Sequence, residues 1–279
     1  MMTKQKLLTR TLRQMHHFRL MGLVALALLL TACATSPLGR KQLILLPDSQ
    51  MDQLGRASYV DLKKKQPVER DPHENRYVQC VVDALTRELA GPWRKVQWEV
   101  TVFKDDSANA FALPGGKIGV HTGLFKAAKN QHQLAAVLGH EIGHVIARHG
   151  NERVSTNLAT QTGLQLAAVL AGGSPQKKQQ LMSLLGVGAQ VGVLLPFSRR
   201  HESEADLIGL DLMARAGFDP RQSIALWQNM QKLGGSKPPE FLSTHPANER
   251  RIFDLNRAME GALAKYGRAL AAGKHPRCH

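Results

Sequence analysis

Five consecutive residues, His140-Glu141-Ile142-Gly143-His144, place the strongest constraint on how this chain can fold. On an α-helix, residues four apart lie about 40° apart on one face, so His140 and His144 could direct two imidazole nitrogens at one ion. Glu141 would lie beside that ion, where a carboxylate can act as a general base. The pattern therefore predicts a helix that carries two metal ligands and a base.

The flanking residues favour a helix over a chance match on some other surface. Apolar side chains recur at helical spacing on both sides of the motif: Leu134, Ala135, Val137, Leu138, Ile142, Val145 and Ile146. Gly150 is the expected end of the helix. Gly139 and Gly143 each weaken a helix by roughly 1 kcal/mol relative to alanine, but they leave room for close packing or for substrate. With 12 histidines in 279 residues, about 0.02 matches are expected by chance.

A catalytic zinc site needs a third protein ligand and an open position. Residues 198–217 read as an amphipathic helix that contains Glu202 and Glu204. The two glutamates are two apart and cannot share a face, whereas Glu202 and Asp206 are four apart and can. We therefore expect Glu202 to bind the metal and Asp206 to fix the tautomer of a ligand histidine through its far nitrogen. The alternative is a charged helix face in contact with solvent.

Three motifs, LGHEIGHV, PFSRRHESEAD and STHPANERR, together resemble those of the peptidase family that contains HtpX, BepA, YcaL and the prenyl-protein proteases. The resemblance covers roughly residues 50–255. It implies a gluzincin, a zinc endopeptidase whose glutamate ligand aligns with Glu202, with one Zn2+ per chain. The implied fold is α+β and mainly helical: a zincin-type domain with a small edge-strand sheet beside the metal-binding helix. The nearest look-alikes are periplasmic lipoproteins of the YcaL and LoiP type.

The resemblance also implies a substrate-binding strand. Residues 109–124 resemble the edge strand and turn that precede the metal-binding helix in this family. An exposed edge strand can accept an extended peptide by main-chain hydrogen bonds. The expected substrate-binding residues are Asn109, Ala110, Phe111 and Ala112. An ordinary hairpin is the alternative.

His245, in Ser243-Thr244-His245-Pro246, is the second catalytic residue that the resemblance implies. Relatives place this histidine near the metal, either to stabilise the oxyanion or to occupy the open coordination position as a latency plug. Arg250 or Arg251 would brace the same loop. Other histidines are interpreted as having no metal role, among them His121, His132 and His149. On a continuous helix, His149 would lie about 140° around from His144.

The first 33 residues are typical of a bacterial lipoprotein signal. Basic residues precede an apolar run, Leu20–Leu30, that is too short to span a membrane. The sequence Leu30-Thr31-Ala32-Cys33 resembles a lipobox, in which Cys33 becomes the first mature residue and carries acyl chains that anchor it to a membrane. Ala34 resembles the outer-membrane sorting signal. An ordinary signal peptide or a short anchor is the alternative.

We therefore expect four segments: a signal peptide at 1–32, a lipidated tether at 33–47, a zinc metallopeptidase domain at 48–270 and a basic tail at 271–279. Cleavage removes five basic residues and no acidic ones, so the net charge falls from +15 to +10. A basic chain attracts anionic partners. With 5% aromatic residues and an export signal, we expect anionic lipids or acidic outer-membrane partners and no nucleic acid.

Periodicity predicts further elements within the domain. Residues 49–65 and 74–89 have helical spacing, whereas residues 96–103 alternate and read as a strand. Residues 154–197 contain two apolar runs, for which a lid-like or buried helical hairpin is favoured over a pair of membrane helices.

Two cysteines remain after lipidation, Cys80 and Cys278, in an oxidising compartment. They could form a disulfide that ties the C-terminal tail to the early helix. Neither cysteine lies in a metal-binding or CxxC spacing.

Two classes of function fit these features. The first is a membrane-anchored periplasmic zinc endopeptidase that hydrolyses unfolded or misassembled envelope proteins, with Glu141 as the general base. The second is a latent or chaperone-like lipoprotein of outer-membrane assembly. The intact Glu141 argues against a purely structural zinc, which needs no base and usually has four protein ligands. A gluzincin aminopeptidase is weaker, since no acidic motif for a substrate amine is recognisable upstream.

Overall fold

The computed structural model describes four stretches of the chain, residues 33–160, 197–233, 240–245 and 249–278. The chain divides into two compact units, Met1–Leu45 and Leu46–His279. In the first unit, β1 (Cys33–Thr35) and β2 (Lys41–Leu43) form an antiparallel hairpin. The segment predicted as a tether therefore contains regular β structure. The predicted signal peptide lies outside the described residues.

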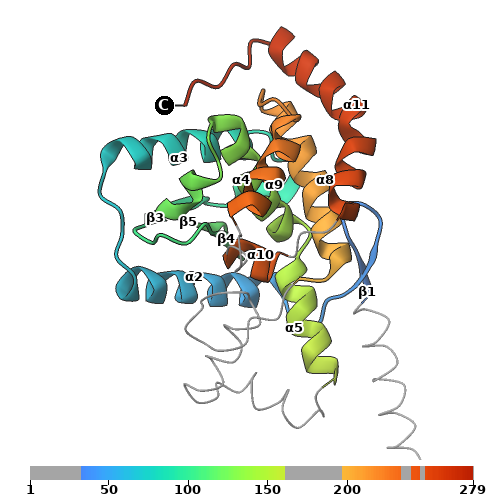
Figure 1. Ribbon diagram of the computed structural model, residues 1–279. Helices are drawn as coiled ribbons and strands as arrows, with labels where there is room; N and C mark the ends of the chain where they lie inside the picture. Colours follow the sequence, from blue (N-terminus) through green and yellow to red (C-terminus); the bar gives the residue numbers. More distant parts are fainter. Residues whose placement is uncertain (1–32, 161–196, 234–239, 246–248, 279) are drawn as a thin grey trace, which may run out of the picture. The chain divides into compact units, whose positions relative to one another are not determined.

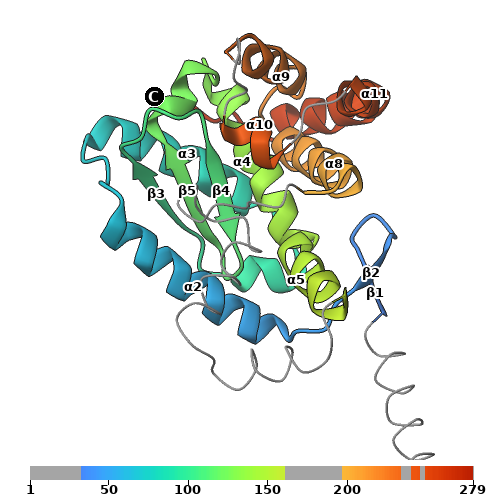
Figure 2. The ribbon, with the colours of Figure 1, turned by 60° about the horizontal axis from the view of Figure 1, so that its bottom comes forward.

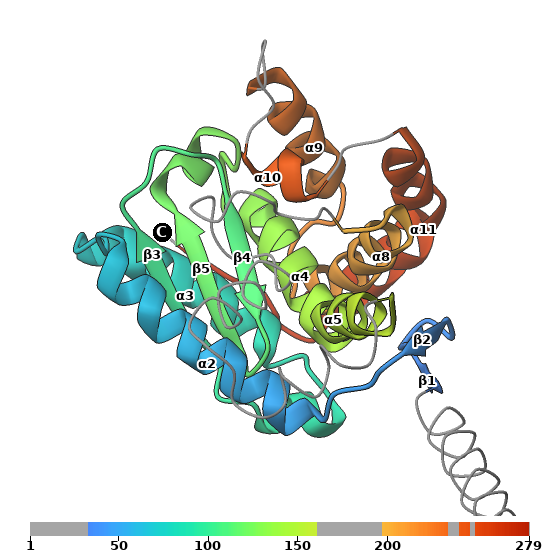
Figure 3. The same ribbon diagram turned by 90° about the horizontal axis from the view of Figure 1, so that it is seen from below.

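The second unit contains a three-stranded sheet in the order β3 (Glu99–Phe103), β5 (Lys117–His121), β4 (Ala110–Leu113). β3 runs parallel to β5, and β4 runs antiparallel to it. The outer side of β3 is paired with the chain near residues 67–69. Within the described part of the chain, β4 is therefore the free edge of the sheet, beside α4 (Gln131–Ile146) (Figure 3). The mainly helical α+β fold with a small edge-strand sheet is confirmed.

Helices cover both faces of this sheet (Figure 2). α3 (Pro72–Thr86) and α4 supply buried apolar side chains to the core on one face, where Ile118 and Val120 lie. α2 (Asp48–Lys65) lies on the opposite face, where the Tyr59 hydroxyl donates to Thr101 Oγ1 at 2.6 Å. These helices and β3 confirm the elements predicted from periodicity, with boundaries shifted by up to three residues.

The helix α8 (Arg199–Arg215) packs along α4, and α11 (Glu249–Ala271) packs on α8 (Figure 1). Glycines allow a close approach of α4 and α8. A Cβ atom at Gly209 would lie 2.7 Å from the backbone nitrogen of His140, and one at Gly143 would lie 2.9 Å from the carbonyl oxygen of Ala205. The glycines of the α4 motif therefore serve helix packing, which brings α8 against the motif.

Side-chain caps fix where these two helices begin. The Asn130 side chain accepts hydrogen bonds from the backbone of His132 and Gln133 at the start of α4. The Ser198 hydroxyl accepts one from the backbone of His201 at the start of α8. Such caps satisfy backbone donors that have no partner within the helix. Two smaller helices, α9 (Gln222–Leu233) and α10 (Glu240–Thr244), complete the surroundings of α4.

The predicted end of the metal-binding helix at Gly150 is wrong. α4 ends at Ile146, and α5 (His149–Thr160) begins three residues later. Arg148 lies between them with φ 56°, in the left-handed region that non-glycine residues seldom adopt. Its guanidinium forms an ion pair with Asp48 at 2.5 Å. The chain therefore changes direction immediately before His149.

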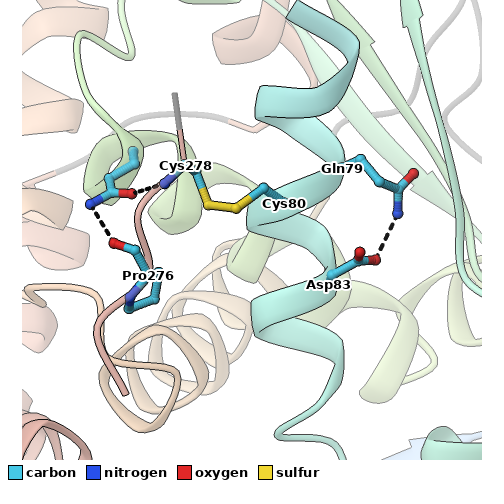
Figure 4. The surroundings of a disulfide bond; sticks show 6 residues. Gln79, Cys80, Asp83, Pro276 and Cys278 are labelled. Carbon is cyan, nitrogen blue, oxygen red and sulfur yellow. Dashed lines mark hydrogen bonds between the residues drawn. A yellow bond between two sulfur atoms is a disulfide. The ribbon is translucent and has the colours of Figure 1, made fainter. Parts of the chain in front are cut away.

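A disulfide joins Cys80 on α3 to Cys278 in the C-terminal segment, with 5.6 Å between the Cα atoms (Figure 4). The backbone nitrogen of Cys278 donates to Gln131 Oε1, and the amide of Gln131 donates to the Pro276 carbonyl. The end of the chain is thus fastened to α3 and to the first turn of α4.

None of the helices in the described part of the chain combines the length and hydropathy needed to cross a membrane. The apolar hairpin predicted within residues 154–197 falls mostly on residues 161–196, which lie outside the described residues.

Candidate metal centre

Four buried side chains from three parts of the chain converge on one point: His140, His144, Glu202 and His245. Each offers one potential ligand atom, and these atoms lie within 4.8 Å of one another. The Nε2 atoms of His140 and His144 are 3.0 Å apart. Carboxylate oxygens of Glu202 lie 3.4 Å from each of those nitrogens. Among the residues that the structure describes, no other group of this kind occurs.

The donor chemistry fits zinc. A tetrahedral zinc ion with ligand distances near 2.0–2.1 Å separates its ligand nitrogens by about 3.3 Å. The separations of 3.0 Å and 3.4 Å are close to that value. Two imidazoles and one carboxylate also leave one coordination position open, as in catalytic zinc sites.

The structure separates the two glutamates that the sequence offered as ligands. Glu202 faces the histidines of the α4 motif. Glu204 points elsewhere, and its Oε2 lies 3.2 Å from His149 Nε2. This division follows the helix-face argument, because residues two apart on α8 cannot face the same way.

Asp206 lies behind His140, with 2.9 Å between Asp206 Oδ1 and His140 Nδ1. Arg251 on α11 donates to both oxygens of Asp206 and pairs with Glu202 at 2.9 Å. It also donates to the carbonyl of His245 at 3.3 Å. Of the two arginines that were candidates to brace this loop, Arg251 is therefore the one that contacts it. The Arg250 side chain is 77% exposed and faces Asp254.

Negative charge dominates the surroundings of His140. Burial lowers the pKa of His140, but Asp206 and Glu202 outweigh this effect and raise it to about 9. Burial lowers the pKa of His144 well below its usual value. Burial would raise the pKa of Glu202, but nearby cationic groups, including Arg251, hold it well below the usual range. Glu202 and Asp206 therefore both remain ionised beside the histidines of the α4 motif.

Glu141 lies between this cluster and the edge strand. Its Oε2 accepts a hydrogen bond from the backbone nitrogen of Ala112 at 3.2 Å, and its Oε1 lies 3.6 Å from His245 Nε2. Burial raises the pKa of the Glu141 carboxyl, which His245 and His140 partly oppose. A carboxylate with a raised pKa is a stronger base and is better suited to taking a proton from water.

The register of β4 divides the four residues predicted to bind substrate. The backbone nitrogen of His121 donates to the Asn109 carbonyl, so Asn109 is hydrogen-bonded into the sheet. Hydrogen-bonded and non-hydrogen-bonded pairs alternate in an antiparallel ladder. The backbone groups of Phe111 therefore also bond inward to Gly119, whereas the backbone N–H and C=O groups of Ala110 and Ala112 point to the free edge. The hydrogen bond from Ala112 to Glu141 agrees with this assignment.

A cleft of about 630 Å³ runs beside the edge strand to the metal cluster. Ala112 and Pro114 line it from the sheet, His144 from α4, and Trp93 and Phe197 from flanking segments. An extended chain paired with β4 would therefore pass His144.

Aromatic rings enclose His245. The ring of Phe241 stacks on it at 4.4 Å and the ring of Phe197 at 5.2 Å between centroids. The backbone nitrogen of Phe197 donates to the Thr244 carbonyl at 3.0 Å. His245 Nδ1 lies 3.2 Å from His140 Nε2 and 3.1 Å from a Glu202 oxygen. No pattern in the sequence indicates that Phe197 completes this enclosure.

His149 is not one of the four potential ligands, in line with the prediction that it has no metal role. Its Nδ1 nevertheless lies 2.9 Å from His144 Nδ1, and the side chain is fully buried. The angle of about 140° from His144 applied to a continuous helix, whereas α4 ends before His149. His121 and His132 do lie apart from the cluster, where they contact Ser107 and Asp219.

The sequence profile of peptidase family M48 matches residues 72–259, which span the edge strand, the metal cluster and Arg251. The chain belongs to peptidase family M48. The matched residues include all four members of the metal-binding cluster, so the cluster lies within the part of the chain that resembles this family of peptidases.

Proteins similar to this chain come from both mitochondria and bacteria. The chain is 40% identical over 172 residues to the mitochondrial metalloendopeptidase OMA1 of Schizosaccharomyces pombe, covering 61% of the chain and 49% of the relative. It is 36% identical over 233 residues to that of Arabidopsis thaliana, covering 81% and 45%. It is 32% identical over 214 residues to the β-barrel assembly-enhancing protease of Escherichia coli, covering 74% and 43%. The chain spans about half the length of these curated relatives.

Proposed function

We propose that this chain is a membrane-anchored zinc endopeptidase that cleaves unfolded or misassembled proteins of the bacterial envelope. The observation that carries the proposal is the convergence of His140, His144 and Glu202 next to Glu141 and a free sheet edge. In the proposal, His140, His144 and Glu202 hold one zinc ion. Asp206 orients His140 through its far nitrogen.

The catalytic work of the chain centres on Glu141. When bound, zinc supplies Lewis acidity to a carbonyl and lowers the pKa of a coordinated water towards about 7. Glu141 would take a proton from the attacking water and would later return it to the leaving amine. Its raised pKa makes the carboxylate a stronger base, which favours the first of these proton transfers. The backbone nitrogen of Ala112 holds the carboxylate in place at the edge of the sheet.

The edge strand supports a substrate that is extended and unfolded. Pairing with the backbone of Ala110 and with the carbonyl of Ala112 uses main-chain groups, so it selects for free backbone and less for side-chain identity. A folded domain has few extended segments with free backbone groups to present to such an edge.

Comparison of the wild-type chain with Glu141→Gln tests this activity. Both proteins should bind zinc, because residue 141 is not a ligand in the proposal. The wild type should cleave unfolded casein faster than a disulfide-bonded folded protein of similar size, and the variant should cleave neither. Equal cleavage by the two proteins would contradict the role of Glu141.

The compartment is proposed from the start of the sequence. The relatives named above include mitochondrial proteins and a bacterial protein, and the lipobox-like sequence Leu30-Thr31-Ala32-Cys33 favours the bacterial envelope. We infer lipidation at Cys33 and an outer-membrane position facing the periplasm. In a Gram-negative host, Cys33→Ser should abolish incorporation of labelled palmitate and release the chain from the membrane fraction. Retention without label would contradict lipidation.

A second candidate is a latent or chaperone-like protein with little proteolysis. The position of His245 favours this alternative, because its Nδ1 lies among the ligand atoms, near the coordination position left open. If His245 is a latency plug, His245→Ala should increase casein cleavage. If instead His245 stabilises the oxyanion, the same substitution should reduce cleavage without reducing zinc content.

A further inference from the structure

The two proposed histidine ligands are backed by different groups. His140 has a carboxylate, Asp206, behind its Nδ1 atom at 2.9 Å. His144 has a second imidazole in the corresponding place, with 2.9 Å between its Nδ1 and that of His149. On its other side, His149 Nε2 lies 3.2 Å from Glu204 Oε2. His144, His149 and Glu204 thus form a buried series.

Only one arrangement of protons lets this series support a metal ligand. If His144 binds a metal through Nε2, its remaining proton lies on Nδ1. His149 Nδ1 must then accept that proton in a hydrogen bond, so the proton of His149 lies on Nε2, where it can be donated to Glu204. In the reverse arrangement, a lone pair on His149 would face the Glu204 carboxylate, and His144 would carry its proton at the metal-binding nitrogen.

We propose that His149 and Glu204 are positioning residues that hold His144 in the tautomer and orientation required for metal binding. This inference rests on the zinc site proposed above. Glu204 selects the tautomer of His149, and His149 in turn selects that of His144. The second glutamate of the α8 sequence, which is not a ligand, thereby acquires a role in the same site.

The surrounding structure fixes His149 firmly enough for this role. The left-handed conformation of Arg148 turns the chain so that His149 faces back towards His144. A backbone conformation of this kind costs on the order of 1–3 kcal/mol and persists where the surroundings require it. The ring of His201 stacks on that of His149 at 4.5 Å and 24° between planes. His149 is 0% exposed.

Zinc affinity of the purified full chain tests the proposal, measured by competition with a chromophoric chelator. Loss of an outer hydrogen-bond partner typically costs about 10–100-fold in metal affinity. His149→Leu should therefore weaken zinc binding by about 10–100-fold, and Glu204→Leu should weaken it in the same direction. His149→Asn keeps an acceptor close to the Nδ1 position and should restore most of the affinity. His132→Leu is the matched control and should leave zinc affinity unchanged, since this histidine contacts Asp219 and lies apart from the cluster.

Nitrogen NMR of histidine-labelled, zinc-loaded wild-type chain gives a second reading that requires no substitution. The proposal expects the proton of His149 on Nε2 and that of His144 on Nδ1. A proton on His149 Nδ1, or unchanged zinc affinity in a folded His149→Leu chain, would overturn the proposal while leaving the zinc site intact. If the wild-type chain binds no zinc, both the site and this inference fail. If His149→Leu does not fold, the NMR assignment decides.

Discussion

Arg251 donates two parallel hydrogen bonds to Asp206, from Nε to Oδ2 at 2.6 Å and from Nη2 to Oδ1 at 2.7 Å, with both side chains buried. The centre of the Trp227 ring lies 3.8 Å from the guanidinium carbon of Arg251. Removing one partner of a buried pair leaves an uncompensated charge, which typically costs 3–5 kcal/mol. The arginine therefore contributes to the stability of the domain and also to the metal centre.

Arg251→Leu should lower the free energy of unfolding by about 3–5 kcal/mol in urea titrations. Arg251→Lys keeps the charge but loses the two parallel hydrogen bonds, so it should lower the free energy of unfolding by less than Arg251→Leu does. The neighbouring Arg250, which is 77% exposed, provides the control. Arg250→Leu should change stability by no more than about 0.5 kcal/mol, and equal losses at the two positions would contradict this account.

The close contact of α4 and α8 should not tolerate a methyl group at Gly209. A Cβ there would meet backbone atoms of Gly139 and His140 at 2.7–3.0 Å, and backbone cannot move aside as a flexible side chain can. Gly209→Ala should destabilise the domain by about 1–3 kcal/mol and weaken zinc binding, since α8 carries Glu202. Gly261→Ala on α11 meets nothing within 4 Å and should stabilise the chain by about 0.5–1 kcal/mol. Thermal unfolding of both variants checks the pair of predictions, and an unaffected Gly209→Ala would refute the first.

The disulfide should stabilise the domain by restricting the unfolded chain. Cys80 and Cys278 are 198 residues apart in the sequence, and loss of a native disulfide typically costs about 2–5 kcal/mol. The free energy of unfolding of the double variant Cys80→Ser, Cys278→Ser should therefore be lower than that of the wild type by about 2–5 kcal/mol. The double variant should unfold at a lower denaturant concentration. Adding reductant should shift the wild type to match the double variant and should not affect the double variant itself. A shift of both proteins would indicate another cause.

Asp211 should make the contact of α8 with α11 sensitive to acid. Burial raises the pKa of Asp211, but Lys265 and Arg215 outweigh burial and hold it below the usual value of 3.8. A carboxyl with a lowered folded-state pKa stabilises the fold above its unfolded-state pKa and loses this effect as the pH falls through the folded-state value. Because these side chains are about one-third exposed, the effect is at most about 1 kcal/mol.

Asp211→Asn should consequently be less stable than the wild type at pH 7, and the difference should narrow as the pH falls below 3.8. Urea unfolding at a series of pH values measures both proteins. A difference that widens with acidification would contradict the assignment of the stabilising charge to Asp211.

The parts of the site that were predictable from sequence depend on local periodicity. His140, His144, Glu202 and Asp206 are spaced four apart within two helices, so helical geometry alone determines which side chains share a face. The residues Pro114-Gly115-Gly116 are typical of a turn, and both glycines have positive φ in the structure. A related pattern could have decided between the two arginines. Arg251 lies on the same buried stripe of α11 as Leu255, Ala262 and Ala269.

The parts that were missed depend on contacts between distant segments. The break after α4 involves Arg148, whose partner Asp48 lies 100 residues earlier, and no periodic pattern contains that contact. His149 could reach His144 only because of this break. The stacking of Phe197 on His245 likewise brings two separate segments together. Helical periodicity predicts which side chains share a face of one helix. It does not predict where a second element packs against that helix.

The most direct test of the central claim is anomalous X-ray scattering at the zinc edge, from crystals of the full chain grown without chelator. The account predicts one zinc peak about 2.0–2.2 Å from Nε2 of His140, Nε2 of His144 and a carboxylate oxygen of Glu202. A chain without zinc at this point, or with Glu204 in place of Glu202 as the ligand, would contradict it.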